Sequence, residues 1–107
     1  MRRGDLVTVA LPGDLGKPRP AVVIQADHFS KLAAVTVLPI TSTLVQAPLL
    51  RVQVEPSGHN GLRASSQIMI DKVQTPPVAR IGEPFGRLDG ATMAAVNRAL
   101  AVFLGLA

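Results

Sequence analysis

Residues 16–25, Gly-Lys-Pro-Arg-Pro-Ala-Val-Val-Ile-Gln, hold the transition that decides the fold. Pro18 and Pro20 belong to a Pro- and Gly-rich segment over residues 12–20, where we expect a loop. Residues 21–24 are then continuously apolar, a pattern typical of a central strand that is buried on both faces. We therefore expect a sheet assembled around the segment 21–25.

Short strands are expected on both sides of this segment. Residues 5–11 carry β-branched side chains in partial alternation, and residues 34–40, 51–55 and 66–71 follow with turn-forming residues between them. Pro39 lies near the end of its strand, so we expect it at a sheet edge or a bulge. Short strands at such close spacing favour a small β barrel.

The C-terminal part of the chain changes to helical spacing. Asp89 is expected to cap a helix whose apolar side chains include Val96 and Leu100, and Gly105 is a suitable C-terminal stop. The chain has 107 residues, which fits one domain over 1–107. The predicted fold class is mainly β, a small barrel with a C-terminal α-helix.

The composition excludes several kinds of chemistry. The chain has no Cys, Trp or Tyr and three Phe, which rules out a disulfide scaffold, a Cys-ligated metal and a Cys nucleophile. The few aromatic rings also argue against recognition of bases by stacking on an aromatic sheet. The net charge of +4 favours a polyanion or an acidic partner, although the basic residues are scattered along the sequence.

No metal, cofactor or membrane segment is expected. His28 and His59 stand alone, without ligands at metal-binding spacing; His28 could move protons near neutral pH, but an exposed turn His is ordinary. The apolar stretch 91–107 contains Asn97 and Arg98 and is shorter than the roughly 20 residues of a membrane-spanning helix. We expect a cytoplasmic protein.

Polar residues at strand ends are the candidates for chemistry. Arg19 lies between two prolines, which hold a guanidinium suited to phosphate on a stiff segment; the alternative is an ordinary surface arginine. Thr41, Ser42 and Thr43 offer three hydroxyls to phosphate oxygens, or a turn that leaves the sheet. Asp71-Lys72 could serve acid–base work or contact a substrate hydroxyl, or form an exposed ion pair.

Five segments in order give the chain a family resemblance. The sequence resembles the MazF/PemK (Kid) family, the toxin halves of bacterial toxin–antitoxin pairs. The segments are RGDLV (3–7), GKPRPAVVIQ (16–25), LPITS (38–42), SQIMIDKV (66–73) and the helix-containing end 86–106. Each segment alone is weakly specific, but together they span nearly the whole chain.

The resemblance implies a fold and an activity. The fold would be an SH3-like barrel of the CcdB/MazF group, assembled as a homodimer. The activity would be a metal-independent endoribonuclease that cuts single-stranded mRNA at a short sequence. In this chemistry the RNA 2′-hydroxyl attacks the adjacent phosphate and leaves a 2′,3′-cyclic phosphate and a 5′-hydroxyl. A cognate antitoxin with an acidic tail would neutralise the toxin.

The same resemblance assigns residues. The catalytic Arg of the family falls on Arg19, its Thr falls on Thr41, and its acidic position falls on Asp71. Lys17, Ser42, Asp71 and Lys72 are expected to contact RNA. Arg19 is expected to stabilise charge on the phosphate rather than to act as an acid, because the pKa of arginine is above about 12.

Three departures accompany the resemblance. The PemK branch has an Arg two residues before the acidic position, where this chain has Met69, and Gln74 replaces a further basic residue. The aromatic residue that is usual in the first strand is Val7 or Thr8 here.

Two alternatives to the ribonuclease are open. One is a CcdB-like poison of DNA gyrase, a non-enzymatic inhibitor on the same fold; such proteins act through a helix end that bears Trp, whereas residues 102–107 contain none. The other is a non-catalytic binding module or an inactive relative, against which the presence of both Arg19 and Thr41 argues.

Overall fold

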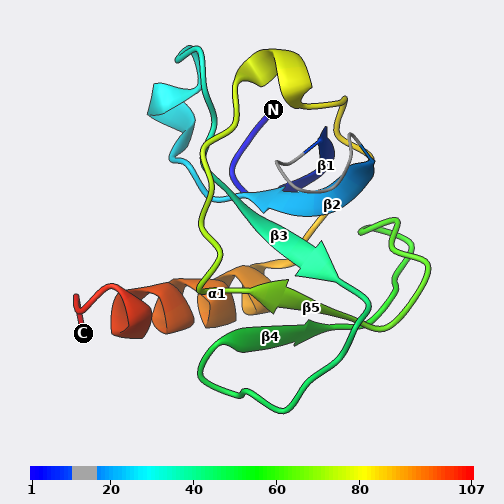
Figure 1. Cartoon of the computed structure of the whole chain (residues 1–107), viewed down its shortest axis with the longest axis vertical. Coiled ribbons are helices and arrows are strands. Elements are labelled where there is room, and N and C mark those ends of the chain that lie inside the picture. Colours follow the sequence, from blue (N-terminus) through cyan, green and yellow to red (C-terminus); the bar gives the residue numbers. More distant parts are fainter. Residues whose placement is uncertain (11–16) are drawn as a thin grey trace.

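The computed structural model describes residues 1–10 and 17–107. Within these residues the chain forms one curled antiparallel sheet with a C-terminal helix beside it (Figure 1). The strand order is β4-β5-β3-β2-β1-β6. The strands are β1 (Asp5–Ala10), β2 (Pro18–Val23), β3 (Val37–Thr41), β4 (Arg51–Val54), β5 (Ser66–Met69) and β6 (Gly86–Arg87). The helices are α1 (Gly90–Phe103) and the 3₁₀ turns η1 (Asp27–Phe29) and η2 (Val78–Arg80). A mainly β fold with a C-terminal helix is confirmed.

The second strand begins earlier than its prolines predicted. β2 starts at Pro18, so the expected loop over 12–20 is wrong at its C-terminal end, and residues 11–16 lie outside the described residues. Pro18 and Pro20 pair with β1, whereas the ladder to β3 begins only at Ala21. A proline lacks an N–H and is tolerated in a strand where one side has no ladder.

Pro39 lies inside the sheet and not at its edge. β3 runs between β2 and β5, so the expectation of an edge position is wrong. The ladder to β2 ends with the pair Ala21–Pro39, and the ladder to β5 starts with the pair Ile40–Ile68. The missing N–H of Pro39 therefore falls where β3 changes its hydrogen-bonding partner, which is also where the sheet curls (Figure 1).

Both faces of the central strands are buried, as the apolar run predicted. Val22 and Leu38 pack with the buried helix residue Val96 in one cluster. Ala21 and Val23 point to the other face of β2 and pack in a second cluster with β1 and β3. The sheet therefore carries one hydrophobic cluster on the face that packs against α1 and a second cluster on the opposite face.

The helix has the predicted ends. Asp89 Oδ1 accepts a hydrogen bond from the Thr92 N–H at 2.7 Å, which satisfies one of the free donors of the first turn. Val96 and Leu100 are buried against the sheet. Gly105 has a φ of 76°, the left-handed conformation that ends many helices and that favours glycine.

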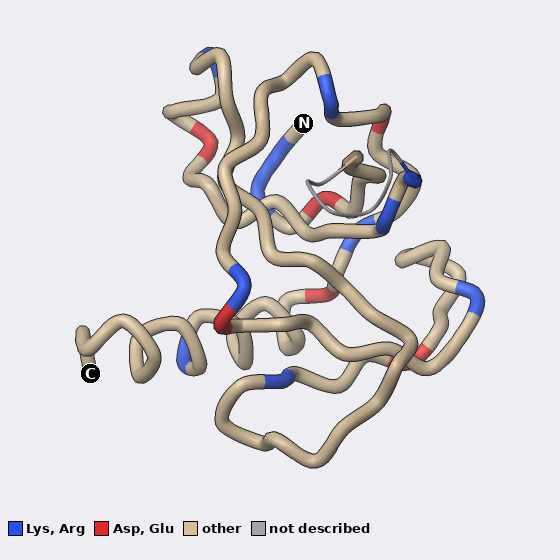
Figure 2. Tube along the Cα trace, in the orientation of Figure 1, with Lys and Arg blue, Asp and Glu red and all other residues tan. Residues whose placement is uncertain are grey.

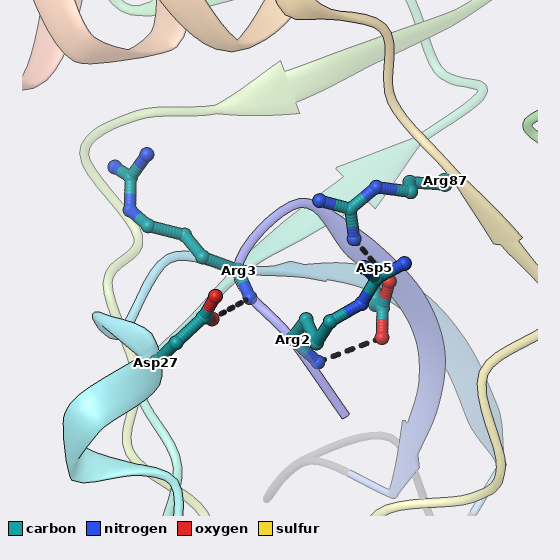
Figure 3. Close-up of polar contacts among 5 residues, drawn as sticks. All are labelled: Arg2, Arg3, Asp5, Asp27 and Arg87. Carbon is teal, nitrogen blue, oxygen red and sulfur yellow. Dashed lines mark hydrogen bonds and ion pairs between the residues drawn. The ribbon is translucent and has the colours of Figure 1, made fainter.

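A polar anchor holds the start of β1 (Figure 3). The Arg3 N–H donates to Asp27 Oδ1 at 2.7 Å, and the Arg2 N–H donates to Asp5 Oδ2 at 2.7 Å. Asp5 is 8% exposed and also pairs with the Arg87 guanidinium of β6. Arg3 and Asp5 of the segment 3–7, the first of the resemblance motifs, therefore make contacts that hold the start of β1 in place.

Candidate active site

Two of the predicted catalytic residues lie at the same end of the sheet. The register between β2 and β3 ends with the pair Ala21–Pro39, and Arg19 and Thr41 each lie two residues beyond it. Both residues therefore lie at the end of the strands where β3 leaves β2 and pairs with β5. Side chains alternate along a strand, so both belong to the face away from α1, the face of Ala21.

The placement of Arg19 follows from its flanking residues. Arg19 is exposed and pairs with Val9 of β1 in the middle of a regular ladder. The prolines on both sides fix their own φ angles, so the strand presents the guanidinium from a restricted backbone. Lys17 is exposed and directly precedes β2, which adds a second positive charge at this end.

Thr41 ends β3 and its hydroxyl is part of a turn. Its Oγ1 accepts a hydrogen bond from the Thr43 N–H at 3.1 Å, which confirms the turn that the hydroxyl-rich sequence suggested. A threonine hydroxyl also has one hydrogen to donate. The turn orients the Oγ1 atom and leaves that hydrogen for a ligand, so the turn and a role in binding are compatible.

Ser42 belongs to the opposite face of the sheet. It is exposed and lines a cavity of about 480 Å³ together with Pro20, Arg63 and Phe85. The cavity has both Pro20 and Ser42 in its wall, which shows that the start of β2 and the end of β3 are neighbours. Candidate residues therefore lie on both faces at this end of the sheet, with Thr41 on one face and Ser42 on the other.

A polar row continues from Thr41 across the next two strands. Thr41 pairs with Gln67 of β5, and Gln67 pairs with Gln53 of β4. Gln67 is 8% exposed, and its side chain accepts from the Val45 N–H at 3.1 Å and donates to the Val45 carbonyl at 3.0 Å. The segment between β3 and β4 is thus held to the sheet by one buried glutamine.

An arginine joins this row from the edge strand. Arg51 Nη1 donates to Gln67 Oε1 at 3.1 Å and more weakly to the Thr43 carbonyl at 3.4 Å. Arg51 pairs across the strands with Met69, the position where the PemK branch has an arginine. The sequence alone points to neither Gln67 nor Arg51, because the hydrogen bonds that give them a role join distant parts of the chain.

A cavity of about 510 Å³ lies beside the row. Gln67, Gln53 and Arg51 form its sheet side, and Val45, Ala47 and Pro48 contribute from the segment between β3 and β4.

An acidic residue, Glu55, directly follows β4 and lies two residues after Gln53. Hydrogen bonds from Ser65 and then from Gln53 lower the pKa of Glu55, so this carboxylate is ionised at neutral pH.

Asp71 and Lys72 lie away from Arg19 and Thr41. They follow β5, whose direction is opposite to that of β3, and Asp71 is four residues beyond Gln67. Residues 70 and 71 form a turn after the end of β5, so Asp71 lies at the other end of this strand from the pair Thr41–Gln67. Lys72 Nζ lies 3.6 Å from Asp71 Oδ2, with side chains 58% and 26% exposed, which confirms the exposed ion pair.

The remaining candidates lie outside this end of the sheet. His28 is exposed in η1 with its ring 4.3 Å from that of Phe29, and His59 is exposed in the turn before β5. Lys and Arg residues are spread over the trace and do not form one run (Figure 2). Among residues 1–10 and 17–107, no three His, Asp or Glu residues gather as a metal site, and no helix is long and apolar enough to cross a membrane.

Comparisons with known proteins agree on one family. The family model for the PemK-like, MazF-like toxin of type II toxin–antitoxin systems matches residues 2–104. A probable endoribonuclease MazF of Mycolicibacterium smegmatis is 48% identical over 108 residues, which cover 100% of this chain and 99% of the relative. Endoribonuclease MazF9 of Mycobacterium tuberculosis is 27% identical over 116 residues, which cover 99% of this chain and 98% of that protein.

Solved structures show the same fold. The Mycobacterium tuberculosis toxin MazF-mt6 superposes with a TM-score of 0.82 at 28% identity, covering 96% of this chain and 98% of that one. A mycobacterial endoribonuclease solved in complex with its cognate antitoxin has a TM-score of 0.81 at 23% identity, covering 100% and 97%. The predicted SH3-like, CcdB/MazF-like architecture is confirmed.

Proposed function

The chain belongs to the PemK-like, MazF-like family of type II toxins and is an endoribonuclease, and from this premise we propose how its residues cut RNA. The observation that supports the proposal is the β2–β3 register, which directs Arg19 and Thr41 to one end of the sheet. The substrate is single-stranded mRNA, met in the cytoplasm. Cleavage uses no metal ion and inhibits translation and growth.

The reaction is an internal transfer of the phosphate. The 2′-oxygen of one nucleotide attacks the adjacent phosphorus atom, and the bond from phosphorus to the 5′-oxygen of the next nucleotide breaks. The 2′-hydroxyl loses a proton and the departing 5′-oxygen gains one, so the products are a 2′,3′-cyclic phosphate and a 5′-hydroxyl. Negative charge collects on the phosphoryl oxygens in the transition state, and preorganised donors at that point are the largest catalytic contribution.

Arg19 and Thr41 are the proposed donors. The guanidinium of Arg19 stabilises the charge on the phosphoryl oxygens, and its planar fork can hold two oxygens at once. The Thr41 hydroxyl donates its hydrogen to one phosphate oxygen while the turn to Thr43 fixes the Oγ1 position. Arg19 does not act as the general acid, because a guanidinium holds its proton too tightly to give it to the departing 5′-oxygen.

The flanking nucleotides contact residues on both sides. Lys17 adds positive charge beside Arg19, and Ser42 offers a hydroxyl toward the opposite face. Asp71 and Lys72 follow the far end of β5 from the pair Thr41–Gln67 and would meet RNA away from the cut. Their proposed role is therefore to bind RNA and not to transfer the proton.

A protein partner and a second copy complete the proposal. The net charge of +4 suits a cognate antitoxin with an acidic tail, since complementary charge speeds association. Large apolar side chains stay exposed on the last turn of α1 and beyond it, namely Val102, Phe103, Leu104 and Leu106. We propose that the toxin is a homodimer that covers exposed apolar surface of this kind.

The test is cleavage of a long single-stranded RNA in EDTA by the purified protein, with both fragment ends mapped. We expect discrete cuts with 5′-hydroxyl ends, lost by a factor of about 100 or more in Arg19→Ala and reduced in Thr41→Val. Arg2→Gln removes the same charge from an exposed side chain at the N-terminal end and should cut normally. Intact RNA with the wild-type protein, together with trapped gyrase–DNA complexes, would instead support the gyrase poison.

A further inference from the structure

We propose that the cavity of about 510 Å³ beside the polar row is a pocket for one unpaired RNA base and that Arg51 determines which base is cut. This inference rests on the proposed endoribonuclease mechanism and adds a specificity-determining residue to it. The cavity is lined by Gln67 and Gln53, which follow Thr41 on the next two strands of the sheet.

The first step is distance. Neighbouring strands lie about 4.8 Å apart, so Gln67 is one strand and Gln53 two strands from Thr41. A phosphate held at Thr41 therefore has a nucleotide within reach of the cavity. The volume of about 510 Å³ is larger than one base needs, and the cavity opens to solvent. Sequence-specific RNA binding proteins take bases from single strands in this way.

The second step is the chemistry of the walls. Val45, Ala47 and Pro48 give an apolar side against which the flat face of a base can pack without an aromatic ring. Gln67 uses both its oxygen and its nitrogen to hold Val45, so its role is to support the wall. The lining also contains the exposed Gln46, but the Arg51 guanidinium is the charged group of the lining and is held in place by the sheet, so it is the proposed reader of the base.

The third step is the donor pattern of Arg51. The hydrogen bonds of Arg51 within the described residues use Nη1 alone, which is held by Gln67 and the Thr43 carbonyl. The guanidinium is thereby oriented, and its Nη2 and Nε donors make no hydrogen bond with residues 1–10 or 17–107. Two parallel donors match a base edge with two neighbouring acceptors, such as O6 and N7 of guanine or O2 and N3 of cytosine.

The negative charge beside the cavity favours a base over a phosphate as its ligand. Gln53 lies between Arg51 and the acidic group Glu55, to which its Nε2 donates at 2.8 Å. Glu55 does not line the cavity, but its negative charge lies next to Gln53 of the wall and disfavours a phosphate on that side, because like charges repel. A neutral base is the better ligand for this position.

The experiment compares cleavage patterns on a randomised RNA pool. Wild type, Arg51→Gln and Ala47→Phe are incubated with the pool and every cut site is sequenced. Ala47→Phe fills the cavity from the segment between β3 and β4 and leaves Arg51 in place. Arg2→Gln is the control for lost charge. We expect both cavity variants to lose the preference at one nucleotide position by about 5- to 140-fold, while other positions keep theirs.

The outcomes distinguish this inference from the mechanism it rests on. No cleavage by the wild type refutes the proposed function itself. Cleavage by Arg51→Gln with the wild-type pattern, whether at the full rate or uniformly slower, refutes base reading by Arg51 and indicates a phosphate contact or none. A changed preference in Arg51→Gln and an unchanged one in Ala47→Phe would overturn the cavity as the place of reading.

Discussion

Replacing Gln67 by leucine should detach the segment between β3 and β4 from the sheet. Leucine has a volume similar to that of glutamine, so the change removes hydrogen bonds with little change in packing. The lost bonds are those with the Val45 N–H at 3.1 Å, the Val45 carbonyl at 3.0 Å and Arg51 Nη1 at 3.1 Å. The bond to Gln53 at 3.4 Å is longer and contributes less.

The magnitude follows from these bonds. A protein hydrogen bond contributes about 0.5–1.5 kcal/mol net, so three bonds amount to about 3 kcal/mol. Val45 is exposed, and its backbone groups can bind water once Gln67 is gone. We therefore expect the free energy of unfolding to fall by about 2–3 kcal/mol, which lowers the urea midpoint by about 1–2 M for a domain of this size.

The assay is urea unfolding followed by circular dichroism, together with hydrogen exchange of the Val45 amide. Gln46→Leu is the matched control, because Gln46 is an exposed glutamine of the same segment, and its effect should stay within about 0.5 kcal/mol. Equal midpoints for the two variants, or unchanged protection of the Val45 amide in Gln67→Leu, would refute the role of Gln67.

Three further predictions concern the frame of the molecule. A methyl group added by Gly86→Ala would clash with the backbone oxygen of Asn60, so we expect the free energy of unfolding, measured in urea, to fall by about 1–3 kcal/mol. Gly58→Ala, where a methyl group would meet no atom within 4 Å, should be neutral. Leu38→Ala removes a fully buried side chain and should cost about 2–5 kcal/mol in the same assay. The Thr92 N–H lowers the pKa of Asp89, so this carboxylate stabilises the fold above its ordinary pKa of 3.8 and the contribution is lost as the pH falls below that value. Asp89→Asn keeps an acceptor for the cap, and its melting temperature should change less with pH below about 4; identical pH profiles would contradict this assignment.

The fold could be predicted where local pattern and burial agree. The apolar segment 21–24 gave a central strand, and Asp89 gave the start of the helix. The prediction was wrong at Pro18 and Pro39, because proline in a strand depends on which neighbour it faces, and strand pairing is not visible in local sequence. The two-residue strand β6 is too short to give a periodic pattern.

The candidate site could be predicted in part. Arg19 and Thr41 are candidates because their segments resemble a family, and they lie at the same end of β2 and β3. Gln67 was read as an ordinary strand residue, since its partner Val45 is 22 positions away in the sequence. Arg51 gains its meaning only from its contact with Gln67, so neither position could be identified from spacing.

The N-terminal anchor has a consequence for how such a toxin can change over time. Asp5 and its ion pair with Arg87 lie four residues from Val9, the neighbour of Arg19, at the opposite end of β1. Arg3 also joins the N-terminal end to the helix through Asn97. A substitution of the exposed Arg19 side chain leaves these contacts in place. The residues proposed to act on RNA and the contacts that fasten the N-terminal end are therefore separate, so a change in the first need not weaken the second.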